Sequence, residues 1–479
     1  MWCLKNAGFF PLLILLLGQH PDALVRQAQD DFNAGRYSSA EATLSRALKA
    51  EPGNWNLWFY LGVSRARLEK IGPAIQAFEK ARSLAPREAP VYFNLALLHM
   101  QQGDVDKALE VYREGLNLDP KDEAANQNYA LLLMQRGRFR EAVEPLQRLK
   151  SIRGGEVSTR ATLIEAYLKG GMKSEGQNEI DQLLTARLAT MQEELALAKL
   201  LSADRETEAA EQILKHATTS WPASAEAHGE LGLLLIQREQ YEGAVGELGR
   251  AVQLDPNSAK YSLGLGEALL RWRHDPIALQ FLLAVREKFG ELPIYKFQLG
   301  LAYFYLTRFR MAIQEFEDLA REKPKASRVQ YFLGGSYQAM GELRKAEDGY
   351  RNAIALNPNE GSYYTALASL LRKEDPADLT EPVRLLENAL ALNPKDDESK
   401  LVLASCFERE GELEKAQALL EQVVESEPGS RRAHSALAGV YYRQKRVEDA
   451  KQQESIAARL EADKLKEVSP WGPGEAMNP

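Results

Sequence analysis

Small and apolar residues recur every thirty-four positions along most of the 479-residue chain. A second small residue follows each first one after twelve positions, as Ala40 follows Ala28, and a Leu usually precedes the first, as Leu61 precedes Gly62. Two small residues at this separation allow two antiparallel helices to approach closely where they cross. The fixed period therefore predicts stacked copies of one helix–turn–helix unit. The first small residues are Ala28, Gly62, Ala96, Ala130, Ala198, Gly232, Gly266, Gly300 and Gly334.

A proline closes most copies, as at Pro86, Pro120 and Pro358. Proline ends a helix because it lacks an amide hydrogen and clashes with the preceding turn. Gly264 and Gly266 fall inside a predicted first helix. We therefore expect them to permit close helix packing and not to form a nucleotide-binding loop. The prediction is an array of helix pairs with short turns.

This pattern resembles the tetratricopeptide repeat (TPR) family. The clearest copy is Trp58, Leu61, Gly62, Ala74, Phe78, Ala81 and Pro86, and another is Leu333, Gly334, Tyr337, Gly341, Ala346, Tyr350, Ala353 and Pro358. The resemblance implies an all-α, right-handed superhelical solenoid of antiparallel helix pairs. Because thirteen copies cover residues 21 to about 464, they leave no room for a separate catalytic domain, and we expect no enzyme activity. The copies begin near residues 21, 55, 89, 123, 157, 191, 225, 259, 293, 327, 361, 397 and 431.

The two ends differ from the array. Residues 1–20 hold Lys5 and an apolar run over 7–18, which is typical of a secretory signal although no clear cleavage site follows. The run is too short to span a bilayer, so we expect no transmembrane span in the mature chain and a periplasmic or extracellular location. An apolar capping helix is the alternative, with a cytoplasmic location. Residues 465–479, rich in Pro and Gly, are expected to be a disordered tail.

Composition narrows the classes of function. Hydrophobic residues make up 45% and charged residues 27%, with a net charge of −8, which disfavours nucleic acid as a partner. The six histidines are dispersed and there are two cysteines, so the sequence predicts no metal site. It contains no phosphate-binding or nucleophile-elbow motif, and we expect no cofactor.

Candidate binding residues lie at positions two, five, nine and twelve of each first helix, which share the face that lines the groove in this family. Two stretches of these positions are apolar, and exposed apolar patches commonly mark partner sites. The alternative is that these side chains pack against the adjacent copy. The first stretch includes Phe59, Val63, Phe93, Leu97 and Leu131, and the second includes Phe297, Leu301, Phe304 and Tyr331, with Tyr305 beside them.

Asn94 and Asn128 both occupy the sixth position of neighbouring copies. This resembles the asparagine ladder with which the TPR superhelix of O-linked N-acetylglucosamine transferase holds a peptide backbone, a task for which an amide has both donors and an acceptor. Ordinary polar surface residues are the alternative. None of the fifth positions is Lys, which argues against binding of acidic chaperone tails.

We therefore predict a non-catalytic scaffold or adaptor that binds a protein or extended peptide in its concave groove, in the cell envelope. The alternative is an accessory or regulatory subunit of a glycosyltransferase or polymer-secretion complex. Sugar binding would favour aromatic platforms flanked by carboxylates, whereas peptide binding favours amides and apolar pockets. The sequence leaves the partner and the oligomeric state open.

Overall fold

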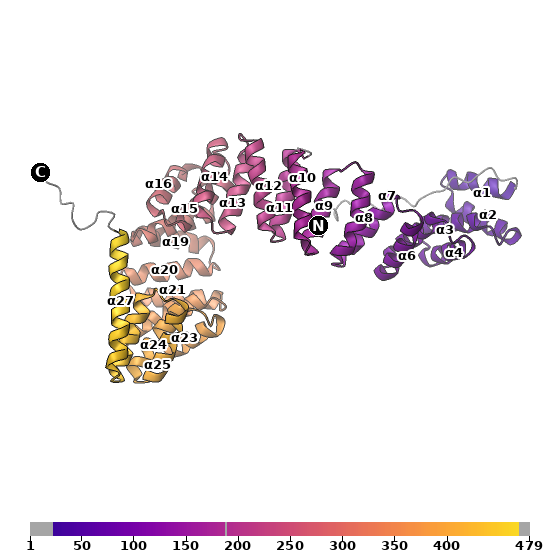
Figure 1. The fold of residues 1–479 in the computed structure, drawn as a ribbon. Coiled ribbons are helices and arrows are strands. Elements are labelled where there is room, and N and C mark those ends of the chain that lie inside the picture. Colours follow the sequence, from indigo (N-terminus) through magenta and orange to yellow (C-terminus); the bar gives the residue numbers. More distant parts are fainter. Residues whose placement is uncertain (1–22, 187–188, 469–479) are drawn as a thin grey trace. The chain divides into compact units, whose positions relative to one another are not determined.

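The computed structural model describes residues 23–186 and 189–468, and every regular element in these ranges is an α-helix. The expected signal at 1–20 lies outside the described residues, as does 469–479 of the expected tail. The last helix reaches Val468 and so includes the first four residues of that tail segment. The helices pair in sequence order, one pair for each of the thirteen copies, which confirms the all-α solenoid of antiparallel pairs (Figure 1).

The chain divides into two compact units, residues 1–234 and 235–479. The first contains α1 (Ala23–Asn33), α2 (Tyr37–Ala50), α3 (Trp55–Arg67), α4 (Ile71–Leu84), α5 (Ala89–Gln101), α6 (Val105–Leu118), α7 (Glu123–Gln135), α8 (Phe139–Ile152), α9 (Val157–Lys169), α10 (Lys173–Thr185), α11 (Met191–Ala203) and α12 (Thr207–Ser220). Helix α13 (Ala225–Gln237) crosses the boundary.

The second unit continues with the remaining helices. They are α14 (Tyr241–Leu254), α15 (Ala259–Arg271), α16 (Asp275–Ala284), α17 (Arg286–Phe289), α18 (Pro293–Tyr305), α19 (Phe309–Glu322), α20 (Ser327–Ala339), α21 (Leu343–Leu356), α22 (Gly361–Glu374), α23 (Thr380–Leu392), α24 (Asp397–Glu410), α25 (Leu413–Ser426), α26 (Arg431–Arg443) and α27 (Val447–Val468).

The repeating small residues place the two helices of a pair in direct contact. A Cβ added to Gly62 would lie 2.9 Å from the ring of Phe78, and one added to Gly300 would lie 2.5 Å from the ring of Phe316. The second small residue, such as Ala74, is fully buried. These contacts confirm that small residues permit the close crossing, because the aromatic ring occupies the space where a side chain would be.

A left-handed residue stands in the turn between the two helices of most pairs. Its positive φ recurs with the same period, and six of these turns use glycine, which adopts this conformation without strain. Six other turns place a larger residue there. The glycine positions are Gly35, Gly103, Gly137, Gly171, Gly341 and Gly411, and the others are Glu69, Arg205, Glu239, Arg273, Thr307 and Lys445.

The second helix of the eighth copy is broken. It ends at Ala284 as α16 and resumes after Val285 as the one-turn α17. Gly290 stands here where other copies carry a proline. The Tyr295 hydroxyl of α18 donates to the Leu282 carbonyl at 2.9 Å, and this hydrogen bond ties the next copy to the broken helix.

Residues 375–379 form a longer turn between α22 and α23, as the sequence predicts for the eleventh copy. Asp375 Oδ1 accepts from the amides of Ala377 and Asp378 at 3.0 and 3.4 Å. Residues 373–378 are exposed, whereas Leu379 is buried. The turn is therefore closed by its own side chain and anchored by one apolar residue.

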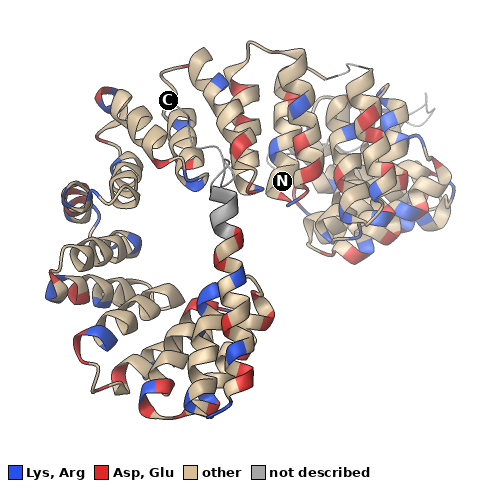
Figure 2. Ribbon diagram, turned by 60° about the vertical axis from the view of Figure 1, so that its left-hand side comes forward, with Lys and Arg blue, Asp and Glu red and all other residues tan. Residues whose placement is uncertain are grey.

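Figure 2 shows acidic and basic residues interspersed along the helices and turns. Many pair within one helix or with the next copy, as Arg351 does with Glu347 and Glu381. Within the described ranges, each helix is too short or too polar to cross a lipid bilayer.

Candidate functional site

The first predicted apolar stretch lies inside the helix stack. Phe59 and Val63 are fully buried, and Phe93 and Leu97 are nearly so, while Leu131 is half-buried. The Phe59 ring meets the ring of Phe78 edge-on, with centroids 5.5 Å apart. These side chains contribute mainly to packing between helices.

The two asparagines at the sixth position are also buried and already hydrogen-bonded within the chain. Asn94 donates from Nδ2 to the Pro90 carbonyl at 2.8 Å, one turn earlier on α5. Asn128 donates from Nδ2 to the Tyr112 hydroxyl at 3.2 Å. Burial raises the pKa of Tyr112, so this hydroxyl stays protonated. The Asn94 amide thus serves its own copy, whereas the Asn128 amide links its copy to the preceding one.

The second apolar stretch is more open. Phe297, Phe304, Tyr305 and Tyr331 are half-buried, and Leu301 is nearly buried. Three of them belong to a cluster of rings between copies. Phe297 and Phe304 meet Phe332 edge-on at 5.8 and 5.3 Å, and Tyr331 stacks on Tyr363 at 5.1 Å. Phe297, Leu301 and Tyr305 also face a cavity.

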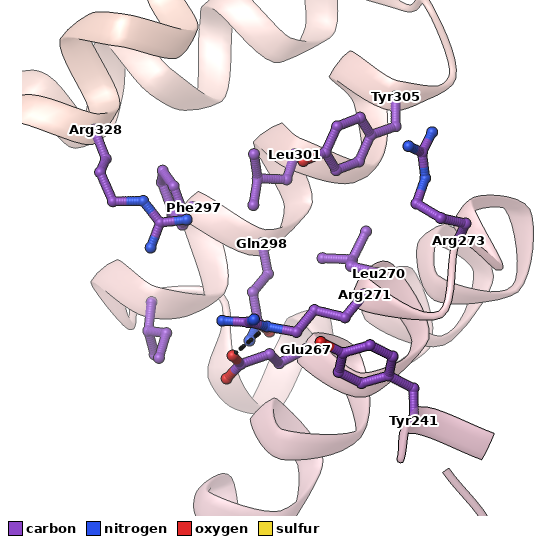
Figure 3. A pocket seen from close by; sticks show the side chains of 11 residues that line it. Tyr241, Glu267, Leu270, Arg271, Arg273, Phe297, Gln298, Leu301, Tyr305 and Arg328 are labelled. Atoms are coloured by element: carbon purple, nitrogen blue, oxygen red, sulfur yellow. Dashed lines mark hydrogen bonds and ion pairs between the residues drawn. The ribbon is translucent and has the colours of Figure 1, made fainter. Parts of the chain in front are cut away.

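This cavity has a volume of about 400 Å³ and lies within the second unit (Figure 3). Helices α15 and α18 supply most of its wall, and α14, α20 and the turn after α15 supply the rest. Its lining residues are Tyr241, Glu267, Leu270, Arg271, Arg273, Ile294, Phe297, Gln298, Leu301, Tyr305 and Arg328. The structure therefore brings together Phe297, Leu301 and Tyr305 of the predicted site.

Arg271 is held by two neighbours in the wall. Its Nε lies 2.9 Å from Glu267 Oε1, and it also hydrogen-bonds to the Tyr241 hydroxyl. The hydrogen bond to Tyr241 and the charge of Glu267 raise the pKa of Arg271. The negative charge of Glu267 is therefore neutralised by the adjacent Arg271.

Arg273 stands in the left-handed turn that follows α15, with φ of 60°. Its guanidinium carbon lies 4.6 Å from the centroid of the Tyr305 ring, a cation–π arrangement. Its Nη2 lies 3.4 Å from Asp275 Oδ2. The turn, where other copies carry glycine, thus positions a cation at one end of the cavity.

Arg328 approaches from the start of α20 at the other end. Its guanidinium carbon lies 5.0 Å from the centroid of Phe297, and within the described part of the chain it forms no ion pair. Between the two ends, Gln298 donates from Nε2 to the Leu263 carbonyl at 2.8 Å. Its buried Oε1 has no hydrogen-bond partner among the described residues.

The sequence interpretation missed the three arginines and Gln298. Arg328 occupies the second position of its copy, and Gln298 occupies the sixth, as Asn94 and Asn128 do in theirs. The repeat positions that predicted the other groove residues therefore also indicate these two. Arg273 stands in a turn, outside the helix face to which the register assigns groove residues, so the register does not mark it. Three arginines and one glutamate in the lining make the cavity cationic in a chain of net charge −8.

Three parts of the chain match repeat-family models. Residues 22–156 match a family described as "Cytochrome c-type biogenesis protein H TPR domain". Residues 378–438 and 409–453 match "Tetratricopeptide repeat", and residues 232–271 match "TPR repeat". The matches lie at the start, middle and end of the described array.

Similar proteins are distant. Anaphase-promoting complex subunit 3 of Dictyostelium discoideum is 31% identical over 83 residues, which are 17% of this chain but only 9% of that protein. The structure of Naa15/Naa10 bound to HypK-THB is 17% identical, with 90% of this chain and 67% of that chain covered and a TM-score of 0.47. Yeast Tom70 is 15% identical, with 94% and 97% covered and a TM-score of 0.41.

The helix pairs of the structure recur at the sequence period of thirty-four residues, and matches to repeat families lie in three separate parts of the chain. On this evidence the chain is a member of the tetratricopeptide repeat family, whose members act as protein-binding scaffolds.

Proposed function

We propose that this chain is a non-catalytic scaffold that holds an extended segment of a protein partner against α15 and α18, with the cavity between them as the main point of contact. The observation that carries the proposal is the apolar floor of this cavity, formed by the half-buried Phe297 and Tyr305 with the nearly buried Leu301 between them. Pockets with an apolar floor and a few polar groups at the rim are typical binding sites.

A location in the cell envelope is part of this proposal. It is supported by the apolar run over residues 7–18 and by the family description matched at 22–156, which names a cytochrome c-type biogenesis protein. We therefore propose that the partner belongs to the envelope, with assembly of cytochrome c as the first process to examine.

The alternative, an accessory subunit that contacts a polysaccharide, has less support. A sugar ring stacks on an open aromatic face, but Arg273 covers the Tyr305 ring and Arg328 covers the Phe297 ring. The carboxylate nearest these rings, Glu267, is engaged with Arg271. The cavity therefore favours a protein segment over a glycan.

The test uses two isoleucines with nearly equal exposure. Ile294 lines the cavity and is 51% exposed, whereas Ile277 on α16 is 52% exposed and lies outside the cavity. Neither truncation should unfold the chain, since both side chains already face solvent. We expect Ile294→Ala to weaken partner binding about tenfold, because it removes apolar area that a partner would bury, and Ile277→Ala to leave binding unchanged.

The measurement is recovery of envelope proteins by the immobilised full chain, quantified by mass spectrometry for wild type and both variants. A protein retained by wild type and by Ile277→Ala but depleted with Ile294→Ala supports the proposal. Equal recovery with both variants, or recovery no greater than on an unrelated bait, would overturn it.

A further inference from the structure

The cavity between α15 and α18 presents two guanidinium groups at the two ends of an apolar strip. The strip consists of Phe297, Leu301 and Tyr305, which lie four residues apart on α18 and so share one face. Arg328 covers the ring of Phe297, and Arg273 covers the ring of Tyr305. Figure 3 shows each arginine beside its ring, with Leu301 between them.

The helix sets the spacing between the two residues whose rings carry these cations. Phe297 and Tyr305 are eight residues apart, which corresponds to about 12 Å along an α-helix, and Leu301 is midway. An extended polypeptide rises about 3.3 Å per residue, and every second side chain points to the same side. Residues i and i+4 of such a segment are thus about 13 Å apart on one side, with residue i+2 midway between them.

Both cations retain hydrogen-bonding capacity for an incoming carboxylate. Arg328 has no ion-pair partner among the described residues. Arg273 reaches Asp275 at 3.4 Å, longer than the roughly 2.8 Å of a strong charge-assisted bond, and a guanidinium has further N–H donors. Repulsion from Glu267 is reduced because Arg271 neutralises its charge.

We propose that the occupant is an extended protein segment with Asp or Glu at two positions four residues apart and a Leu-sized apolar side chain midway between them. The two carboxylates pair with Arg273 and Arg328, and the apolar side chain packs on Leu301. Two separate cations require at least one side-chain carboxylate, since a chain terminus supplies only one. This inference rests on the proposed function and specifies the chemistry of the partner at that site.

The turn that holds Arg273 offers a clean variant. Arg273→Gly removes the guanidinium and places in the left-handed turn the residue that six other copies use, so the fold should be as stable as wild type or more so. Arg205→Gly is the matched control, because Arg205 stands in the equivalent turn of the sixth copy with φ of 66° and does not line the cavity. Arg328→Gln removes the second charge at an exposed position.

The experiment selects peptides from a displayed random library on the immobilised full chain, with the free ends of synthetic peptides blocked before measurement. Enriched peptides should carry the acidic–x–apolar–x–acidic pattern. Their binding, followed by fluorescence anisotropy, should fall at least tenfold with Arg273→Gly, with Arg328→Gln, or when either acidic residue becomes its amide. It should also weaken in high salt and be unchanged by Arg205→Gly.

Two other outcomes separate the inference from the proposed function. If enriched peptides lose affinity with Ile294→Ala but lack the paired acidic residues, or are indifferent to both arginine variants, the inference is wrong and the scaffold proposal stands. If no enriched peptide depends on Ile294, the cavity does not bind extended segments, and both proposals fail.

Discussion

The close contact between Gly300 and Phe316 predicts a measurable penalty for a single methyl group. A Cβ at residue 300 would lie 2.5 Å from one ring carbon of Phe316 and 2.8 Å from two others, and the ring is fully buried. Forcing a methyl group into a packed site costs about 1–3 kcal/mol. Because alanine also favours a helix by about 1 kcal/mol over glycine, Gly300→Ala should be destabilising by a net of about 0–2 kcal/mol.

Gly246→Ala is the control that isolates the packing effect. Gly246 lies inside α14, and an added Cβ would meet nothing within 4 Å. This variant should gain the same helix preference, about 1 kcal/mol, without the clash. The difference between the two variants, about 1–3 kcal/mol, is therefore the cost of the contact with Phe316.

Urea unfolding followed by circular dichroism compares the variants, and amide hydrogen exchange in α18 and α19 measures the local free energy of opening. The local measurement matters because long repeat arrays unfold in parts. Replacing the ring by Phe316→Leu should reduce the penalty of Gly300→Ala, since the two residues are in contact. Equal stability of Gly300→Ala and Gly246→Ala would refute the packing explanation of the repeat.

Three further outcomes are expected. Burial raises the pKa of Glu194, so the contribution of this carboxyl group to stability is present below its unfolded pKa of 4.5 and is lost as pH rises through the folded pKa. Glu194→Gln should therefore melt at a higher temperature than wild type at pH 7 and at nearly the same temperature at pH 4. A lower melting temperature of Glu194→Gln at pH 7 would contradict this. The buried Cys406 thiol, whose pKa burial raises, should resist iodoacetamide in the folded chain and react in urea, measured by mass spectrometry in a Cys3→Ser background. Gly341→Ala should cost about 1 kcal/mol in urea unfolding because φ is 79°, and Gly341→Asn should cost less; equal stabilities would exclude strain in this turn.

The array itself could be predicted from the sequence because its signal is repeated. Several copies place a small residue against the aromatic or leucine side chain of the second helix, and the same register appears at Gly62 and at Gly334. The left-handed turns follow the register too, but residues such as Thr307 and Lys445 conceal them, since nothing in a single copy marks those positions as turns with positive φ.

The site could be predicted only in part, because the repeat positions that face the groove do not determine how exposed their side chains are. Phe59 and Phe297 occupy the same fifth position, yet Phe59 is enclosed by rings of its own unit whereas Phe297 borders a cavity. Exposure depends on which side chains the adjoining copies contribute. The boundary after Leu234 was likewise invisible, since the thirty-four-residue period continues through it.

The turn at residues 375–379 has a practical consequence. Asp375 closes it through local hydrogen bonds, and α22 and α23 keep their normal lengths on either side. A short foreign sequence introduced after Asp378 should therefore leave the flanking helices paired. An epitope or a fluorophore attachment site there would permit labelling of the intact scaffold without altering the groove residues.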